Sequence, residues 1–283
     1  MNIAYINGSF LPKEDIRISP DDRGFLFGDG IYEVMKWYGK FFFDPESHLV
    51  RLKRSLREVH IDWPGADSFT SLAGELIKAN NLDDKQALIY LQVTRGEAPR
   101  NHAFPDPAVP PTIYAFAREI VQPDAGPGPG VGVLLRKDIR WSRCDIKSVS
   151  LLANTLCFQE AHERGLKECI FVRDGVITEG SRSNIFLVAG GTLYTHPESG
   201  YILSGVTRKN IIRMAKESGI PVKEVPFEEK DLAKTDEAFI TNTSAEVSPV
   251  VAFDTLQVGN GRPGPVTLQI YNKFHAEIAG LKL

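Results

Sequence analysis

Hydrophobic residues recur along the 283-residue chain in two patterns, one typical of strands and the other of helices. Short runs rich in β-branched and aromatic residues predict a strand and turn at 5–8 and further strands at 87–93 and 112–117. Residues 30–37 are expected to form a hairpin with Gly39-Lys40-Phe41. The first half of the chain is therefore expected to contain a sheet.

Helical spacing also occurs in this half. Asp44 and Pro45 are typical of an N-cap and a first helical position. Four apolar residues then recur every three to four positions and would form the buried stripe of a helix: Leu49, Leu52, Leu56 and Val59. A second helix is predicted at 69–79.

The second half mixes the two patterns without strict alternation of strand and helix. Strands are predicted at 131–135, 168–172, 176–179, 184–188, 192–194 and 238–241. Helices are predicted at 152–164, 206–218 and 266–279. Asp174 and Gly175 predict a hairpin turn, and Gly165 and Gly219 each predict a helix end. This order of elements favours an α+β fold over a Rossmann fold.

A segment rich in proline and glycine, Gln122–Gly130, interrupts the pattern near the middle of the chain. Such composition is typical of a linker. We therefore expect an N-terminal domain over 1–120, a linker over 121–130 and a larger C-terminal domain over 131–283.

Composition narrows the class of protein. Hydrophobic residues make up 42% and charged residues 24% of the chain, as in ordinary globular proteins. The net charge of −3 argues against a nucleic-acid partner. Three cysteines are too few for a disulfide framework, which favours a reducing compartment. With no signal peptide or membrane-spanning run evident, the expected location is the cytoplasm.

Two residues suggest the chemistry. Lys147 lies in an extended, largely apolar stretch, and burial disfavours the charged form of a lysine. A neutral amine can form a Schiff base with a carbonyl compound, the bond that holds pyridoxal phosphate. Glu179 lies where a predicted strand meets a turn and could serve as the anionic partner of the pyridine nitrogen. On pattern alone, Lys147 could equally be a structural lysine and Glu179 a solvated turn carboxylate.

Several motifs in the same order resemble the fold-type IV pyridoxal-phosphate enzymes, and among these the D-amino-acid aminotransferases. They run along nearly the whole chain: Phe27–Glu33, His48–Leu52, Arg140 with Asp145–Ser148, Thr178–Ser181 and Thr243–Val247. The resemblance implies two domains with the active site at their interface. It also implies that Lys147 is the Schiff-base lysine and carries a proton during catalysis, and that Glu179 keeps the pyridine nitrogen protonated.

The resemblance further identifies residues that hold the cofactor phosphate. They are Arg51, Val206, Thr207, Thr243 and Ser244. A guanidinium suits phosphate oxygens, and the helix predicted to begin near Val206 would offer N–H groups to an anion. Without the resemblance, Arg51 could be a solvated helix residue, Thr207 a plain N-cap and Thr243–Ser244 a turn. The sequence departs from its relatives at Asn242, where hydroxyl residues are common, and at Arg182, which interrupts a run of small residues.

Substrate recognition would depend on Tyr32, Arg100 and His102. The resemblance implies that these residues bind the substrate α-carboxylate, with Arg100 and His102 reaching the active site of the partner subunit in a homodimer. Taken alone, Arg100 could be a solvated loop arginine. Retention of all three favours D-amino acids, such as D-alanine, and 2-oxo acids, such as 2-oxoglutarate, as substrates of a ping-pong transamination.

Other functions remain open at this point. The same fold includes branched-chain L-aminotransferases, (R)-amine transaminases and aminodeoxychorismate lyases, and a non-catalytic pyridoxal-phosphate-binding protein is a rival of another class. The histidines and cysteines have no metal-ligand spacing, so no metal is expected. No G-x-S-x-G motif supports a serine hydrolase.

Overall fold

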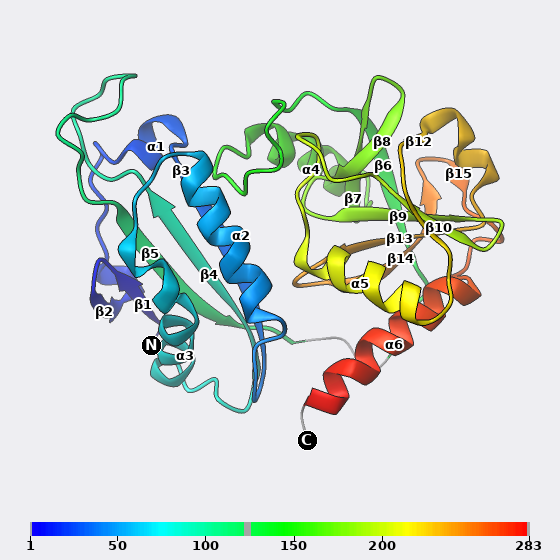
Figure 1. Ribbon diagram of the computed structural model, residues 1–283, viewed down its shortest axis with the longest axis horizontal. Helices are drawn as coiled ribbons and strands as arrows, with labels where there is room; N and C mark the ends of the chain where they lie inside the picture. The colour runs from blue at the N-terminus through cyan, green and yellow to red at the C-terminus, as the bar shows by residue number, and fades with distance from the viewer. Residues whose placement is uncertain (1, 122–125, 282–283) are drawn as a thin grey trace. The chain divides into compact units, whose positions relative to one another are not determined.

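The computed structural model describes residues 2–121 and 126–281. The chain divides into two compact units (Figure 1). The first comprises Met1–Pro123 with Ile146–Ser150, and the second comprises Asp124–Asp145 with Leu151–Leu283. Part of the predicted linker, residues 122–125, lies outside the described residues, so the linker stays a prediction.

The first unit contains a five-stranded antiparallel sheet in the order β2-β1-β5-β4-β3. Its strands are β1 (Ile3–Ile6), β2 (Ser9–Pro12), β3 (Gly30–Tyr38), β4 (Gln86–Thr94) and β5 (Thr112–Glu119). Its helices are η1 (Lys13–Asp15), α1 (Arg23–Phe27), α2 (Pro45–Glu58), η2 (Pro64–Ser68) and α3 (Phe69–Ala79). The helices α2 and α3 cover one face of the sheet (Figure 1).

The core of this unit follows the period of each element. On β4, alternate residues from Ala87 to Val93 are buried and pack against α2 and α3. Leu52 and Leu56 of α2 join them at helical spacing. The N-cap prediction is confirmed, because the Asp44 side chain accepts a hydrogen bond from the Ser47 N–H at 3.3 Å and Pro45 opens α2.

The predicted hairpin between 30–37 and 39–41 is present as a short return, because the Tyr38 N–H donates to the Phe41 carbonyl at 2.9 Å and Trp37 forms an antiparallel bridge with Phe42. The main partner of β3 is another strand. β3 pairs along its whole length with β4, from Gly30 opposite Thr94 to Tyr38 opposite Gln86. Beyond Gly39 the chain returns to β3 through a single bridge. The return is short because the N-cap of α2 follows within a few residues.

The second unit is built on a ten-stranded sheet in the order β11-β10-β9-β13-β14-β6-β7-β8-β12, with β15 paired to β14. Its strands are β6 (Val131–Lys137), β7 (Glu168–Arg173), β8 (Val176–Gly180), β9 (Asn184–Ala189), β10 (Thr192–Thr195), β11 (Val222–Glu224), β12 (Phe227–Glu228), β13 (Glu237–Asn242), β14 (Glu246–Phe253) and β15 (Leu256–Gln257). Its helices are α4 (Leu152–Glu163), α5 (Val206–Glu217), η3 (Glu229–Lys234) and α6 (Pro265–Leu281).

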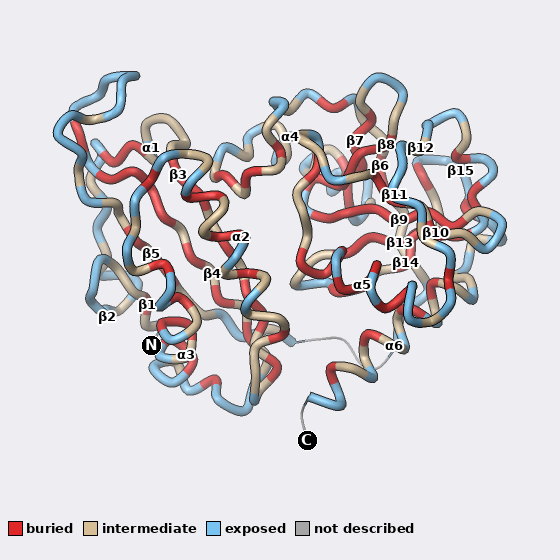
Figure 2. The backbone as a smooth tube through the Cα atoms, viewed as in Figure 1, coloured by how far each residue is buried: buried red, intermediate tan, exposed pale blue. Residues whose placement is uncertain are grey.

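Burial in this unit is greatest along the middle of the sheet. β7, β9 and β13 are buried over nearly their whole length, as Figure 2 shows. Strands covered on both faces read as continuous apolar runs, which is why the sequence patterns of these three were clear. Helices α5 and α6 pack on β13, and α4 packs on β7.

The segment that carries Lys147 belongs to the first unit, whereas the sequence placed it in the C-terminal domain. The Tyr32 N–H donates to the Lys147 carbonyl at 2.9 Å, and the Val149 N–H donates to the Gly30 carbonyl at 3.0 Å. Ile146 also joins the core of the first unit. The segment therefore lies along the free edge of β3. Edge pairing between distant segments leaves no local pattern in the sequence.

Gly96 lies near the start of the loop between β4 and β5 and adopts a φ of +96°. A Cβ added at Gly96 would lie 2.0 Å from the Pro110 carbonyl oxygen, so the two ends of the loop meet there. Only glycine adopts this conformation at little cost and allows this approach.

We expect Gly96→Ala to lower the free energy of unfolding by roughly 1–3 kcal/mol, because the new methyl group adds backbone strain and a clash. Gly74→Ala is the matched control, since Gly74 lies within α3 and an added Cβ would meet no atom within 4 Å. That change should stabilise the protein by about 0.5–1 kcal/mol through helix propensity. Urea unfolding of both variants measures the difference, and equal midpoints would contradict the close approach.

Candidate active site

Lys147 lies beside the ring of Tyr32 in the first unit. Its Nζ is 4.2 Å from the ring centroid, and its side chain is half-buried. The Lys147 N–H donates to Ser55 Oγ at 3.3 Å, while its carbonyl accepts from Tyr32. The backbone of this lysine is thus fixed on both sides, so its amine is delivered to a defined place next to Tyr32.

Arg51 is buried and paired with a carboxylate that the sequence did not assign a role. Its Nε donates to Glu33 Oε2 at 3.0 Å and its Nη2 to Glu33 Oε1 at 2.5 Å. His48 Nδ1 lies 2.9 Å from the same Oε1. Burial by itself would raise the pKa of Glu33, but Arg51 and His48 outweigh it and hold that pKa well below its usual range. Burial lowers the pKa of His48. A bidentate pair of this kind fixes the plane of the guanidinium.

Glu179 is buried at the end of β8 and accepts three hydrogen bonds. Arg140 Nη1 donates to Oε1 at 2.7 Å, and Asn184 Nδ2 and the Leu203 N–H donate to Oε2 at 3.1 and 2.9 Å. Burial raises the pKa of Glu179 to about 7, although Arg140 and the Leu203 N–H act in the opposite direction. This carboxyl can therefore gain or lose a proton near neutral pH.

Arg140 is itself held by a second carboxylate. Its Nε and Nη2 donate to Asp138 at 3.0 Å each, and its guanidinium lies 4.2 Å from the ring centroid of Phe171. Arg173 also pairs with Asp138, at 3.1 Å. Burial tends to raise the pKa of Asp138, but the hydrogen bonds from Arg140 outweigh it and lower that pKa. The Arg140 guanidinium is therefore fixed before it meets Glu179.

The turn that follows Glu179 is held by a buried glutamate. Ser181 Oγ and Ser183 Oγ both donate to the carboxylate of Glu168, the latter at 2.8 Å. Arg182 places its guanidinium 4.2 Å from the ring centroid of Phe158. The departure at Arg182 is thus accommodated on the outer side of the turn, while the small residues on either side of it keep their buried bonds.

The predicted phosphate ligands of the second unit lie at a helix N-terminus and in a turn. α5 begins at Val206 with Gly205 as N-cap, and no side chain caps it. Thr207 is therefore the second residue of the helix. A Cβ at Gly205 would lie 2.1 Å from Asn184 Oδ1, so a larger residue there would displace the Asn184 side chain. The first N–H groups of α5 can receive an anion.

Thr243 and Ser244 follow β13 in a turn that Asn242 organises. Asn242 Oδ1 accepts the Ser244 N–H at 3.0 Å, the Ser244 Oγ–H at 3.0 Å and the Ala245 N–H at 2.7 Å. Asn242 therefore stabilises this turn from within, and Thr243 stays half-buried while Ser244 is exposed.

Arg100 and His102 lie on the exposed loop between β4 and β5. The Arg100 guanidinium is 5.2 Å and the His102 ring 5.4 Å from the ring of Phe27, measured between the guanidinium carbon or ring centroid and the Phe27 centroid. The structure thus brings both residues to α1.

The structure gathers the predicted residues in groups. Tyr32, Arg51 and Lys147 lie in one part of the first unit, Arg100 and His102 share a loop of the same unit, and Glu179 with the phosphate ligands belongs to the second unit. Sequence reasoning assigned no role to five residues that hold them: Glu33, His48, Asp138, Arg140 and Asn184. Glu33, His48 and Arg140 lie in motifs that the sequence shows, and Glu33 is also a charged residue within a largely apolar strand.

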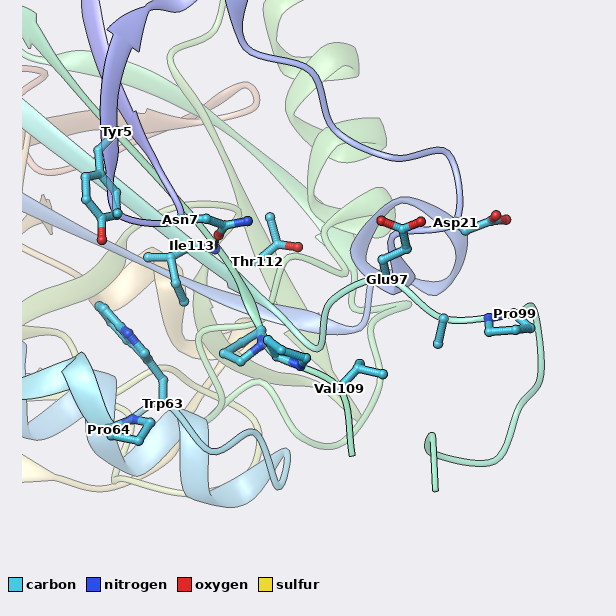
Figure 3. A pocket seen from close by; sticks show the side chains of 14 residues that line it. Tyr5, Asn7, Asp21, Trp63, Pro64, Glu97, Pro99, Val109, Thr112 and Ile113 are labelled. Atoms are coloured by element: carbon cyan, nitrogen blue, oxygen red, sulfur yellow. Dashed lines mark hydrogen bonds between the residues drawn. The ribbon is translucent and has the colours of Figure 1, made fainter. Parts of the chain in front are cut away.

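The first unit also contains a pocket of about 890 Å³. Tyr5 and Trp63 lie at one end of it and Asp21 and Glu97 at the other, as Figure 3 shows. None of the predicted site residues lines this pocket. This pocket is therefore not part of the candidate site.

Across residues 2–121 and 126–281, no group of three or more His, Cys, Asp or Glu side chains is placed to hold a metal ion. Within the described part of the chain, every helix is too short or too polar to span a membrane.

Comparison with known proteins gives long matches. A family model described as amino-transferase class IV matches residues 30–253. The D-alanine aminotransferase of Staphylococcus haemolyticus is 41% identical over 279 residues, which cover 98% of each chain. That of Listeria innocua is 38% identical and covers 96% of this chain and 95% of its own. The branched-chain amino acid aminotransferase from Escherichia coli matches with a TM-score of 0.87 at 27% identity, covering 97% and 93% of the two chains.

We expect the ligand-free protein to lose stability as the pH rises through about 7, because Glu179 must then ionise while buried. Its pKa rises from an ordinary value of 4.5 on folding, so its stabilising contribution is complete below pH 4.5 and is lost as the pH rises through about 7. Glu179→Gln removes this titration. Relative to that variant, wild type should lose roughly 1–3 kcal/mol of unfolding free energy between pH 5 and pH 8.5. Urea unfolding at both pH values measures this, and parallel pH dependence would contradict the raised pKa.

Proposed function

Because the chain belongs to the class IV aminotransferase family, we propose that it moves amino groups between D-amino acids and 2-oxo acids with pyridoxal 5′-phosphate as cofactor. The observation that carries the D-amino-acid assignment is 41% identity to a D-alanine aminotransferase over 98% of the chain. The arrangement of Lys147 beside Tyr32 supports the aminotransferase chemistry.

The residues present suit this cofactor. A lysine amine is held at a fixed place, a buried carboxyl has a pKa raised to about 7, and α5 presents an N-terminus that no side chain caps. When bound, pyridoxal phosphate supplies an aldehyde that bonds reversibly to amines and a ring that accepts electrons.

Lys147 would hold the cofactor through Nζ and then act as the base that takes the proton from the substrate Cα. Both tasks need an amine in a constant place, which the bonds from Lys147 to Ser55 and Tyr32 provide. The ring of Tyr32 limits the positions of Nζ on one side.

Glu179 would keep a proton at the pyridine nitrogen. A carboxyl with a pKa near 7 can share a proton with that nitrogen, which is the role expected of it. Arg140 and Asn184 fix the orientation of the carboxylate.

The phosphate would be held by Arg51, Val206, Thr207, Thr243 and Ser244. Arg51 supplies a guanidinium, whose orientation is fixed by its two hydrogen bonds to Glu33. Val206 and Thr207 contribute the first N–H groups of α5. In the turn after β13, Thr243 would add its hydroxyl, and the Ser244 hydroxyl would turn from Asn242 to the phosphate.

Arg100, His102 and Tyr32 would bind the substrate α-carboxylate. A guanidinium and two single donors suit this group. We further propose a homodimer in which Arg100 and His102 of each subunit serve the active site of the other.

The three cysteines carry free thiols, which is consistent with the cytoplasmic location expected from the sequence.

A branched-chain L-amino acid aminotransferase is the second candidate function, because the structural match to such an enzyme covers 97% of the chain. Its identity of 27% is lower than the 41% to the D-alanine enzyme, which favours the D-amino-acid assignment. Turnover assays with D-alanine and L-leucine also distinguish the proposed function from three alternatives: an (R)-amine transaminase, an aminodeoxychorismate lyase and a non-catalytic protein.

Borohydride reduction of the cofactor-loaded protein should attach the pyridoxyl group to Lys147, and peptide mapping identifies the labelled residue. Lys147→Ala should lose nearly all turnover, since the nucleophile and the base are the same amine. Lys78→Ala is the control, because Lys78 is exposed at the end of α3, and it should keep wild-type turnover. Recovery of the label on Lys36, which is buried on β3, would overturn the assignment.

Arg100→Ala should lower kcat/KM for D-alanine by roughly tenfold to a hundredfold, because a charge-assisted hydrogen bond contributes about 1.5–3 kcal/mol. Cofactor absorbance should not change, since Arg100 is assigned to the substrate. Arg17→Ala is the control: Arg17 is exposed, and the hydrogen bonds found for its guanidinium go to carbonyls of its own segment. If wild type prefers L-leucine to D-alanine, the branched-chain assignment replaces this one.

A further inference from the structure

Arg23, the first residue of α1, is a buried arginine to which neither the sequence motifs nor the proposed reaction assigns a role. It is 3% exposed. Its Nη1 donates to the carbonyls of Asn101 at 2.5 Å and Ala103 at 3.2 Å, and its Nη2 lies 3.5 Å from the carbonyl of His102. One guanidinium therefore gathers three consecutive carbonyls, all in the part of the loop that carries Arg100 and His102.

The start of the same loop is bonded to the segment around Arg23. The Arg23 N–H donates to the Gly96 carbonyl at 2.9 Å, and the Ala98 N–H donates to the Asp21 carbonyl at 3.2 Å. Asp22 and Glu97 form a bridge between these two bonds. The backbone from 96 to 98 and the carbonyls from 101 to 103 are thus both attached to one short segment.

Asp29 holds Arg23 in this position. Its Oδ2 accepts from Arg23 Nε at 2.8 Å, and the same carboxylate accepts two bonds from Arg95, at 2.8 and 2.9 Å. Arg95 also donates to the carbonyls of Val59 and His60, which follow α2. The guanidinium of Arg95 lies 3.5 Å from the ring centroid of Phe104, the residue that follows the held carbonyls. The loop is therefore connected through Asp29 to the end of α2.

This network fixes the backbone but leaves the side chains of Arg100 and His102 exposed against Phe27. An exposed loop loses conformational freedom when it binds a small anion, and a loop that is already ordered loses less. A binding group also needs support from residues whose own positions are fixed. Arg23 provides that support through the main chain and does not compete for the substrate.

We propose that Arg23, held by Asp29, is a positioning residue that sets the conformation of the loop from which Arg100 and His102 bind the substrate α-carboxylate. The identity of the substrate rests on the proposed function, whereas the role of Arg23 in ordering the loop is independent of that function.

Arg23→Gln is the first test, made in the cofactor-loaded protein. Asp29 keeps its two bonds from Arg95 in this variant, so the carboxylate is not left without a partner. We expect the KM for D-alanine to rise roughly tenfold, with kcat within about twofold of wild type, because binding and not the proton transfer is affected. Cofactor absorbance should stay unchanged. Arg17→Gln, an exposed arginine of the same unit, should leave both constants unchanged.

A double-mutant cycle separates positioning from general destabilisation. In the Arg100→Ala/His102→Ala background, Arg23→Gln should change kcat/KM for D-alanine by less than about twofold, because both groups that it positions are already absent. If the effects multiply as independent factors, Arg23 does not act through Arg100 and His102. The inference is then wrong, while the proposed function stands if wild type turns over D-alanine.

Amide hydrogen exchange gives a readout that does not depend on activity. Peptides covering 100–104 should exchange faster in Arg23→Gln than in wild type or Arg17→Gln, with exchange in β4 unchanged. Unchanged exchange in the loop would overturn the inference. Should Arg23→Gln fail to fold, Arg23→Lys keeps the charge beside Asp29 but has no guanidinium to span three carbonyls, and the same faster exchange is expected of it. If wild type does not turn over D-alanine, the proposed function fails and the exchange result alone decides the role of Arg23.

Discussion

Glu33, a carboxylate with no exposed surface, holds the Arg51 guanidinium through two hydrogen bonds in the interior of the first unit. Removing one partner of a buried pair leaves an uncompensated charge, which typically costs about 3–5 kcal/mol. The pair therefore fixes the position of β3 against α2. Because successive strand residues point to opposite faces, Tyr32 must then face away from α2. Lys147 binds the backbone of Tyr32 at the free edge of the same strand, so one register places three of the predicted site residues.

The buried carboxylates Glu33 and Glu179, one in each unit, are both paired with an arginine but differ in function. In the first, Arg51 and His48 outweigh burial, and Glu33 stays ionised as a permanent anchor. In the second, burial outweighs Arg140, and the pKa of Glu179 rises to about 7. A residue that only positions a guanidinium should not titrate in the working range, whereas one that shares a proton with a ring nitrogen should. The environments of the two carboxylates match these separate tasks.

The sequence predicted the family, the fold-type IV architecture and most helices and strands, because those depend on local periodicity and on motifs that are contiguous in the chain. It did not predict α1 or β14, and it placed Lys147 in the wrong unit. β14 contains Pro249 and alternates weakly, so it lacks a strand signature. The partners Glu33 and Arg140 also went unassigned, since a buried ion pair joins residues far apart in sequence.

The residues assigned to chemistry come mostly from places where regular structure begins or ends: the irregular segment of Lys147, the loop of Arg100, the start of α5 and the turn at Thr243. Backbone groups there have no ladder or helix to bind, so polar side chains must satisfy them. Ser55 accepts from the Lys147 N–H, and Asn242 gathers donors of the Thr243 turn. Irregular backbone lets these side chains extend to a ligand, and buried polar residues such as Glu33 and Arg140 fix the positions of Arg51 and Glu179. The motifs contain residues of both kinds, and the contacts of the folded chain are needed to tell them apart.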